Sequence, residues 1–249
     1  MDHLALLFGA GLLAGAMNAA AGGGTFVTLP ALILAGVPSV AANASSTVAL
    51  VPGTFASAWA YRRDFHGFEG VSMRAMLALS VLGGLLGALL LMATAPAAFD
   101  FLVPWLLLLG AITFAFGRGA GVVLRRHISI GPHALLVCQF FLGIYGGYFG
   151  GAVGIMMMAT WSLLGTVEVT AMSAARVLLV SAANAVAVIV FVVAGSVWWR
   201  PTLVVLVAAV IGGYAGARLA RRLPPARLRL AITLFNFALT AAFFVWRGI

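Results

Sequence analysis

Six long apolar segments constrain this chain more than any other feature. They cover residues 43–60, 74–93, 99–117, 171–194, 202–217 and 228–246. A hydrocarbon core about 30 Å thick takes roughly 20 apolar residues per helical span, so segments of this length predict transmembrane helices. Hydrophobic residues make up 64% of the 249 residues and charged residues only 8%, which excludes a water-soluble fold. The chain is expected to be an all-α integral membrane protein.

Two further apolar stretches are interrupted in the middle. Residues 4–36 are broken at 18–24 (NAAAGGG), and residues 132–165 are broken at 146–151 (GGYFGG). The arms of the first stretch would be about 14 and 12 residues long, which is too short to cross a bilayer. Irregular backbone at membrane depth is tolerated only where it is buried in protein or lines a cavity. Each stretch is therefore predicted to be a re-entrant hairpin or a broken helix.

The two halves of the chain match each other at a nearly constant offset of 128 or 129 residues. The matching positions are Gly15 with Gly143, Gly22 and Gly23 with Gly150 and Gly151, Gly83, Gly84 and Gly87 with Gly212, Gly213 and Gly216, and Pro96 with Pro225. Coincidence of glycine and proline at one offset indicates an internal duplication. The GGxxG groups that start at Gly83 and Gly212 are expected to be helix-packing surfaces.

The arginines predict how the segments are oriented, because Arg in short loops stays on the cytoplasmic side. If both interrupted stretches enter and leave by one face, eleven Arg share a side: Arg62, Arg63, Arg74, Arg118, Arg125, Arg126, Arg218, Arg221, Arg222, Arg227 and Arg229. Only Arg200 and Arg247 fall on the other side. If these stretches crossed once instead, the Arg218–Arg229 group would lie opposite Arg62. The hairpin arrangement fits the charge rule better, and it puts both termini on the periplasmic face of a bacterial inner membrane.

Each half then holds one hairpin and three crossings, so the second half must be inserted upside down. The predicted architecture is two inverted-topology repeats, residues 1–117 and 131–249, joined by a cytoplasmic linker at 118–130. Inverted repeats with discontinuous helices are typical of secondary transporters, which bind substrate between the repeats near the midplane. The net charge of +9 is explained by orientation, so no nucleic-acid partner is expected.

Several motifs together carry a family resemblance. They are residues 15–24 (GAMNAAAGGG), Pro30, Gly36 and residues 42–47 (ANASST) in the first half, and residues 146–154 (GGYFGGAVG), Asn184, Gly195, Trp198 and residues 212–218 (GGYAGAR) in the second. Over nearly its whole length the chain resembles the TauE/SafE family of membrane permeases, also called the sulfite exporter family. The resemblance implies transport of a small sulfur-containing oxyanion such as sulfite, thiosulfate or an organosulfonate.

The glycine-rich interruptions are the first candidate anion site. They hold Gly22, Gly23 and Gly24 before a helix expected from Thr25, and Gly150 and Gly151 in the second half. First-turn amides of a helix lack intrahelical partners and carry the positive end of the helix dipole. Two such tips meeting at mid-depth would bind an anion. The alternative is that these glycines only permit tight turns and close packing.

Polar side chains near the first interruption are further candidates for substrate binding. Asn18 lies beside the first turn, and Asn43, Ser46 and Thr47 lie near the start of the next helix. An unsatisfied polar group in lipid costs several kcal/mol, so these groups must face protein, substrate or water. Helix capping and interhelical hydrogen bonds are the alternative roles. Tyr148 flanks the second tip and is expected to form a wall of the pocket.

Arg176 is the one basic residue inside an apolar segment. A central Arg costs roughly 2.5–3.5 kcal/mol on insertion scales, so a contact with the anion would explain its presence. It lies near enough to the segment start that its side chain could instead reach the cytoplasmic interface. Asn184, two helical turns further in, is expected to share the anion site.

Other chemistry is sparse in this sequence. The four His lie near segment ends and none of the five acidic residues lies in the middle of a span. We therefore expect no enzyme activity, no metal and no cofactor, and the partners expected are a small anion and the lipid bilayer. Uniport, anion exchange and ion coupling stay open, as do a homodimer, a small-anion channel and a carboxylate as substrate.

Overall fold

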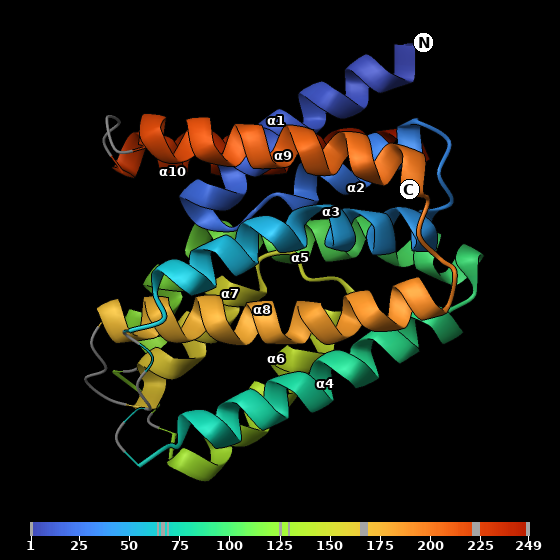
Figure 1. Ribbon diagram of the computed structural model, residues 1–249. Coiled ribbons are helices and arrows are strands. Elements are labelled where there is room, and N and C mark those ends of the chain that lie inside the picture. The colour runs from blue at the N-terminus through green and yellow to red at the C-terminus, as the bar shows by residue number, and fades with distance from the viewer. Residues whose placement is uncertain are drawn as a thin grey trace.

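The computed structural model of the chain describes residues 2–63, 65, 68, 70–124, 126–128, 130–164, 169–220 and 225–247 (Figure 1). These residues are almost entirely helical, with one isolated bridge between Phe68 and Val71. The helices are α1 (Asp2–Ala21), α2 (Thr25–Leu34), α3 (Ser39–Ala60), α4 (Met73–Ala93), α5 (Pro96–Leu124), α6 (Pro132–Tyr148), α7 (Val153–Trp161), the 3-10 turn η1 (Ser162–Leu164), α8 (Val169–Val193), α9 (Trp199–Ala220) and α10 (Pro225–Arg247).

Five helices in the described part of the chain are long and apolar enough to cross a membrane. They cover Met73–Ala93, Pro96–Gly117, Ala171–Val193, Trp199–Arg218 and Arg229–Trp246. This confirms the all-helical membrane class and five of the six predicted spans. The sixth, α3, has sufficient length at 22 residues, but its first half carries a run of polar residues from Asn43 to Thr47 that lowers its mean hydropathy.

Two predicted boundaries are wrong. α1 is 20 residues long, whereas an arm of about 14 residues was expected from the apolar pattern. The helix continues through Asn18 because three alanines follow, and alanine has the highest helix propensity. At the other boundary, α5 runs to Leu124, so residues 118–124 of the predicted linker are helical.

Small residues bring helices from the two halves of the chain into close contact. α1 packs along α9, and α4 packs along α6. A side chain added at Gly212 would collide with the α1 backbone at Leu12, and one at Gly83 would collide with the α6 backbone at Phe140. The GGxxG groups are thus confirmed as packing surfaces. α3 and α8 contact each other, and each also packs against one of these pairs, α3 on α9 and α8 on α4.

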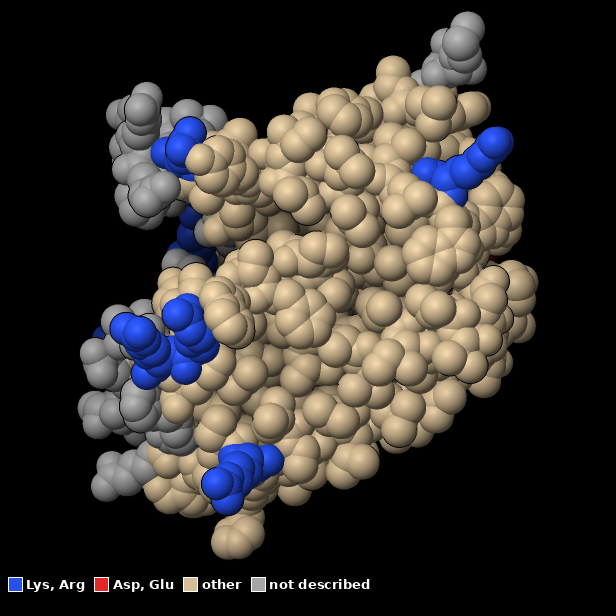
Figure 2. All heavy atoms as spheres, viewed as in Figure 1, with Lys and Arg blue, Asp and Glu red and all other residues tan. Residues whose placement is uncertain are grey.

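The molecule has two distinct ends. α3 and α9 end, and α4, α8 and α10 begin, at the end drawn on the left in Figure 1. We call this the arginine end, because Arg62, Arg74, Arg218 and Arg229 follow or begin these helices there. Figure 2 shows most basic side chains of the visible face gathered at this end. Both chain termini lie at the other end, the terminal end, where α9 begins beside Arg200.

Candidate functional site

Two helix breaks with the same backbone geometry form the base of the site. Gly22 follows α1 with φ +82° and Gly150 follows α6 with φ +79°. The amide of Gly22 donates to the carbonyl of Asn18 (3.0 Å), and the amide of Gly150 donates to the carbonyl of Tyr145 (3.2 Å). Both are left-handed helix C-caps, a conformation that glycine adopts without steric cost. The chain then starts again as α2 at Thr25 and as α7 at Val153.

A cavity of about 690 Å³ lies between the two breaks and extends from them. Its lining on α3 runs from Thr47 to Ala60, and its lining on α9 runs from Ala209 to Ala217. Both stretches lie toward the C-terminal ends of their helices. The cavity therefore extends from the breaks toward the arginine end, and in Figure 2 the surface is hollowed between the groups of basic side chains there.

Seven of the thirteen predicted site residues line this cavity. They are Asn18, Gly22, Thr25, Thr47, Gly150, Arg176 and Asn184. They come from α1, α2, α3, α8 and the two breaks, so residues separated by more than half of the sequence meet in one place. The predicted grouping of both tips with Arg176 and Asn184 thus corresponds to a single cavity in the fold.

Arg176 connects the two breaks. Its stem crosses α7, where a Cβ atom added at Gly154 would lie 2.8 Å from Cδ and 2.9 Å from Cγ of the arginine. Its guanidinium lies at the first break, where a Cβ atom added at Gly22 would lie 3.5 Å from Nη1. The charged group therefore faces the C-terminal end of α1, whose dipole is negative, and it lines the cavity.

The remaining six predicted residues lie outside the cavity lining. The Nδ2 group of Asn43 donates to the carbonyl of Tyr148 (2.8 Å), and the hydroxyl groups of Ser46 and Thr28 bond each other. The Tyr148 hydroxyl bonds Thr94 (3.2 Å). These three side chains hold helices together, which is the alternative role considered for Asn43 and Ser46.

The three other glycines outside the lining serve packing and capping. Gly24 caps α2 by accepting from the amides of Val27 and Thr28, and a side chain there would contact Leu50. Gly23 is buried beside Met17, and the Gly151 carbonyl accepts from the hydroxyl of Tyr145 (2.8 Å).

Beyond the breaks, the terminal end is closed by apolar side chains. Phe99, Phe149 and Phe191 belong to one buried cluster and are at most 1% exposed. Across this region the amide of Trp198 donates to the hydroxyl of Ser45 (3.0 Å). The cavity is thus open toward one end of the molecule and closed toward the other.

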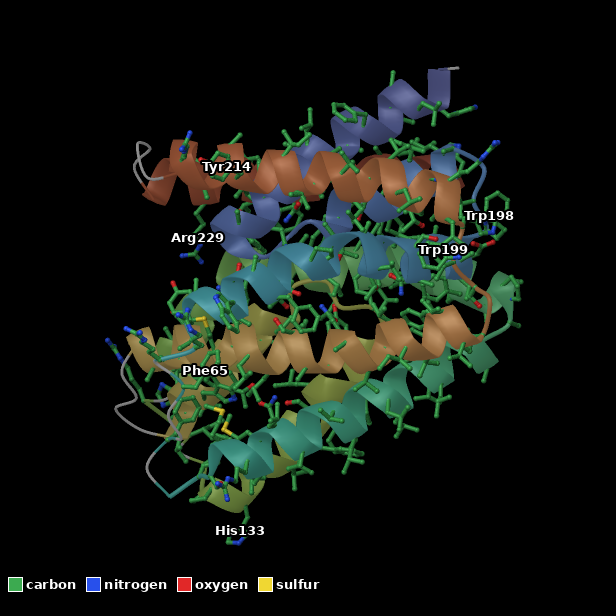
Figure 3. The ribbon with its side chains drawn as sticks, viewed as in Figure 1. Phe65, His133, Trp198, Trp199, Tyr214 and Arg229 are labelled. Atoms are coloured by element: carbon green, nitrogen blue, oxygen red, sulfur yellow. The ribbon has the colours of Figure 1, made fainter. Side chains whose placement is uncertain are left out.

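Four polar residues that line the cavity were missed from the sequence. They are Thr54, Ser57 and Tyr61 on α3 and Tyr214 on α9. Thr47, Thr54 and Tyr61 are spaced by seven residues and share one helix face, so helical periodicity would have found the α3 set. Figure 3 shows Tyr214 and Arg229 at the arginine end and Trp198 and Trp199 at the terminal end.

The mouth of the cavity is basic and aromatic. The guanidinium of Arg218 stacks on the ring of Tyr214 at 4.3 Å and bonds its hydroxyl. Arg62 stacks on Trp59 at 4.6 Å, one helical turn from Ser57. Among the described residues no group of three or more His, Cys, Asp or Glu could hold a metal ion. The arrangement is suited to attracting and holding a small anion.

Comparison with known proteins decides the family. The family model described as "Sulfite exporter TauE/SafE" matches residues 7–243. The chain belongs to the TauE/SafE family. TauE/SafE relatives include a "Probable membrane transporter protein" of Haemophilus influenzae, 29% identical over 97% of this chain and 94% of that protein. Two others are "Probable membrane transporter protein ORF9" of a Sinorhizobium species (28% identical, 87% and 83% covered) and "Probable membrane transporter protein YfcA" of Escherichia coli K12 (27%, 87% and 80%). No solved structure matches the chain.

Membership in the TauE/SafE family, together with five membrane-length apolar helices among the described residues, makes the chain a multi-pass membrane transporter. The same assignment implies transport rather than catalysis. What a TauE/SafE protein of this sequence transports must be argued from its cavity.

Proposed function

We propose that this protein is a secondary transporter that moves a small sulfur-containing oxyanion, such as sulfite, thiosulfate or an organosulfonate, across the bacterial inner membrane. The observation that carries the proposal is the position of Arg176, whose guanidinium lines the cavity at Gly22 between the two helix breaks. A cation at this depth costs several kcal/mol unless it is paired or hydrated, so it has a functional reason to be there.

The first break supplies the other groups that an oxyanion needs. Thr25 begins α2 and lines the cavity, so the first-turn amides of α2 and the Thr25 hydroxyl lie beside the guanidinium. Helix N-termini attract anions, and Arg binds two oxygens of a tetrahedral or pyramidal anion at once. Asn18 contributes an amide on the same side of the cavity. We place the substrate among Arg176, Thr25 and Asn18.

We infer that the chain works by alternating access of two inverted repeats, residues 1–117 and 131–249. The helix contacts support this, because α1 on α9 and α4 on α6 are equivalent pairs at the 128–129-residue offset. In the proposed topology the arginine end is cytoplasmic and both termini are periplasmic. The structure then corresponds to a state open to the cytoplasm and closed on the periplasmic side by the cluster around Phe149.

Transport by purified protein in proteoliposomes tests the proposal. Uptake of radiolabelled sulfite or thiosulfate should saturate, and internal unlabelled anion should accelerate it, because a carrier returns faster when loaded. Sulfate, sulfoacetate and acetate serve as competitors. Absence of trans-acceleration would indicate a channel, and competition by acetate alone would show that the substrate is a carboxylate.

A further inference from the structure

The two helix breaks differ in one respect that bears on coupling. Both α1 and α6 end inside the protein on a left-handed glycine, Gly22 or Gly150, and both present the negative end of a helix dipole there. The Arg176 guanidinium lies beside the break at Gly22. At Gly150, the neighbouring polar group from α8 is the neutral side chain of Asn184.

Two oxygen atoms face the same space beside Gly150. A Cβ atom added there would lie 3.3 Å from the carbonyl oxygen of Gly146 and 4.0 Å from Oδ1 of Asn184. The Gly150 amide, which would bond Gly146 in a continuing helix, bonds Tyr145 instead. Oδ1 of Asn184 is buried and accepts no hydrogen bond from the described residues. Buried acceptors without donors are costly, and a bound cation would satisfy both.

Thr47 brings a third oxygen toward this break. It lines the cavity together with Gly150 and Asn184, and it is the residue that corresponds to Arg176 at the 129-residue offset. Its neighbour one turn earlier, Asn43, is bonded to the carbonyl of Tyr148 at the end of α6. The Thr47 hydroxyl donates to the carbonyl of Asn43 (3.0 Å), which leaves its oxygen lone pairs as acceptors.

We propose that the second break binds an alkali-metal cation, Na⁺ in particular, through Oδ1 of Asn184, the hydroxyl of Thr47 and the carbonyl of Gly146. Ends of half-helices and unwound carbonyls are the groups that hold Na⁺ in discontinuous-helix transporters. The cation takes at Gly150 the place that the guanidinium of Arg176 takes at Gly22. It lies in the same cavity as the anion, and coupling of the two rests on the proposed function, whereas cation binding does not.

Thermal unfolding of the purified protein in detergent tests the site directly. The melting temperature is measured in NaCl, KCl and choline chloride at constant ionic strength and without any oxyanion. We expect it to rise with Na⁺ concentration relative to choline. Asn184→Ala and Thr47→Val should each weaken the apparent Na⁺ affinity about tenfold or more. Ser181→Ala is the matched control, because its hydroxyl is buried on the same helix one turn away and lies outside the cavity lining.

Asn184→Asp keeps the size of the side chain, adds a charge and should tighten Na⁺ binding, which covers the case in which Asn184→Ala does not fold. Equal melting temperatures in all three salts, or an unchanged Na⁺ response in both Asn184→Ala and Thr47→Val, would overturn the proposal. So would loss of sulfite stabilisation in Asn184→Ala with the Na⁺ response intact, because Asn184 would then bind the anion. A Na⁺ response without any oxyanion response would leave the cation site standing and remove the proposed substrate.

Discussion

Gly22 holds a backbone conformation that other residues adopt only with strain. Its φ of +82° lies in the left-handed region, which costs an L-residue about 1–2 kcal/mol. We expect Gly22→Ala to lower the free energy of unfolding by about that amount. Gly9→Ala is the control, because Gly9 lies inside α1 with open space around it, and alanine there should be neutral or stabilising by roughly 0.5–1 kcal/mol. Similar losses for both variants in chemical denaturation would contradict the role assigned to the break.

Gly154 makes room for the stem of Arg176 on α7. A Cβ atom at this position would lie within 3 Å of two stem carbons, so a larger side chain must displace the arginine from Gly22. We predict that Gly154→Leu weakens oxyanion binding about tenfold or more, or about 1.4 kcal/mol. Anion titrations monitored by thermal shift check this. Unchanged affinity with a folded protein would show that the path of the stem does not determine the site.

At the scale of elements, a buried polar network holds α7 to its neighbours. Nε1 of Trp161 donates to Oε1 of Gln139 (2.9 Å), and Nε2 of Gln139 donates to the hydroxyl of Ser80 (2.8 Å). All three side chains are fully buried. The network joins the end of α7 to α6 and α4, and so fixes the element on which Arg176 lies.

Gln139→Leu should destabilise the protein by about 1–2 kcal/mol, because it leaves the indole N–H of Trp161 buried without an acceptor. The double variant Gln139→Leu with Trp161→Phe removes the donor as well and should recover part of the loss. A double-mutant cycle on unfolding free energies measures this coupling. Additive effects of the two substitutions would argue against a shared network.

Helices and breaks were predictable because each leaves a local pattern. Apolar runs located five spans, and the two glycine-rich interruptions located the breaks. α3 was harder to place, since its polar residues serve two different surfaces. Asn43 and Ser46 bond other helices, whereas Thr47 and Thr54 face the cavity. A single sequence does not show which polar residue faces which surface.

The position of Arg176 was beyond prediction for a related reason. Its distance from the helix start allowed both a cavity contact and a path to the interface. The outcome depends on Gly154 and Gly22, which come from α7 and from the end of α1. Such tertiary contacts leave no spacing signal in the sequence. The length of α1 was missed because alanine fits both a helix and a loop.

At the scale of the whole molecule, the account requires the arginine end to be cytoplasmic. A reporter active only in the periplasm should give no signal when fused after Gly119, because α5 approaches the arginine end there. Fusion after Ser196, in the connection between α8 and α9 at the terminal end, should give strong activity. The reverse pattern would invert the orientation and the side to which the cavity opens.

The central claim is that Arg176 binds a sulfur oxyanion inside the cavity, and equilibrium binding tests it most directly. Stabilisation of the purified protein by sulfite, thiosulfate and sulfoacetate is compared for the wild type, Arg176→Ala and Arg229→Ala. Arg229 is a matched cation, bonded to the carbonyl of Ala115 outside the cavity lining. The account predicts binding to the wild type and to Arg229→Ala, and a loss of at least about 100-fold, or 2.7 kcal/mol, in Arg176→Ala. Unchanged binding to Arg176→Ala would contradict the account.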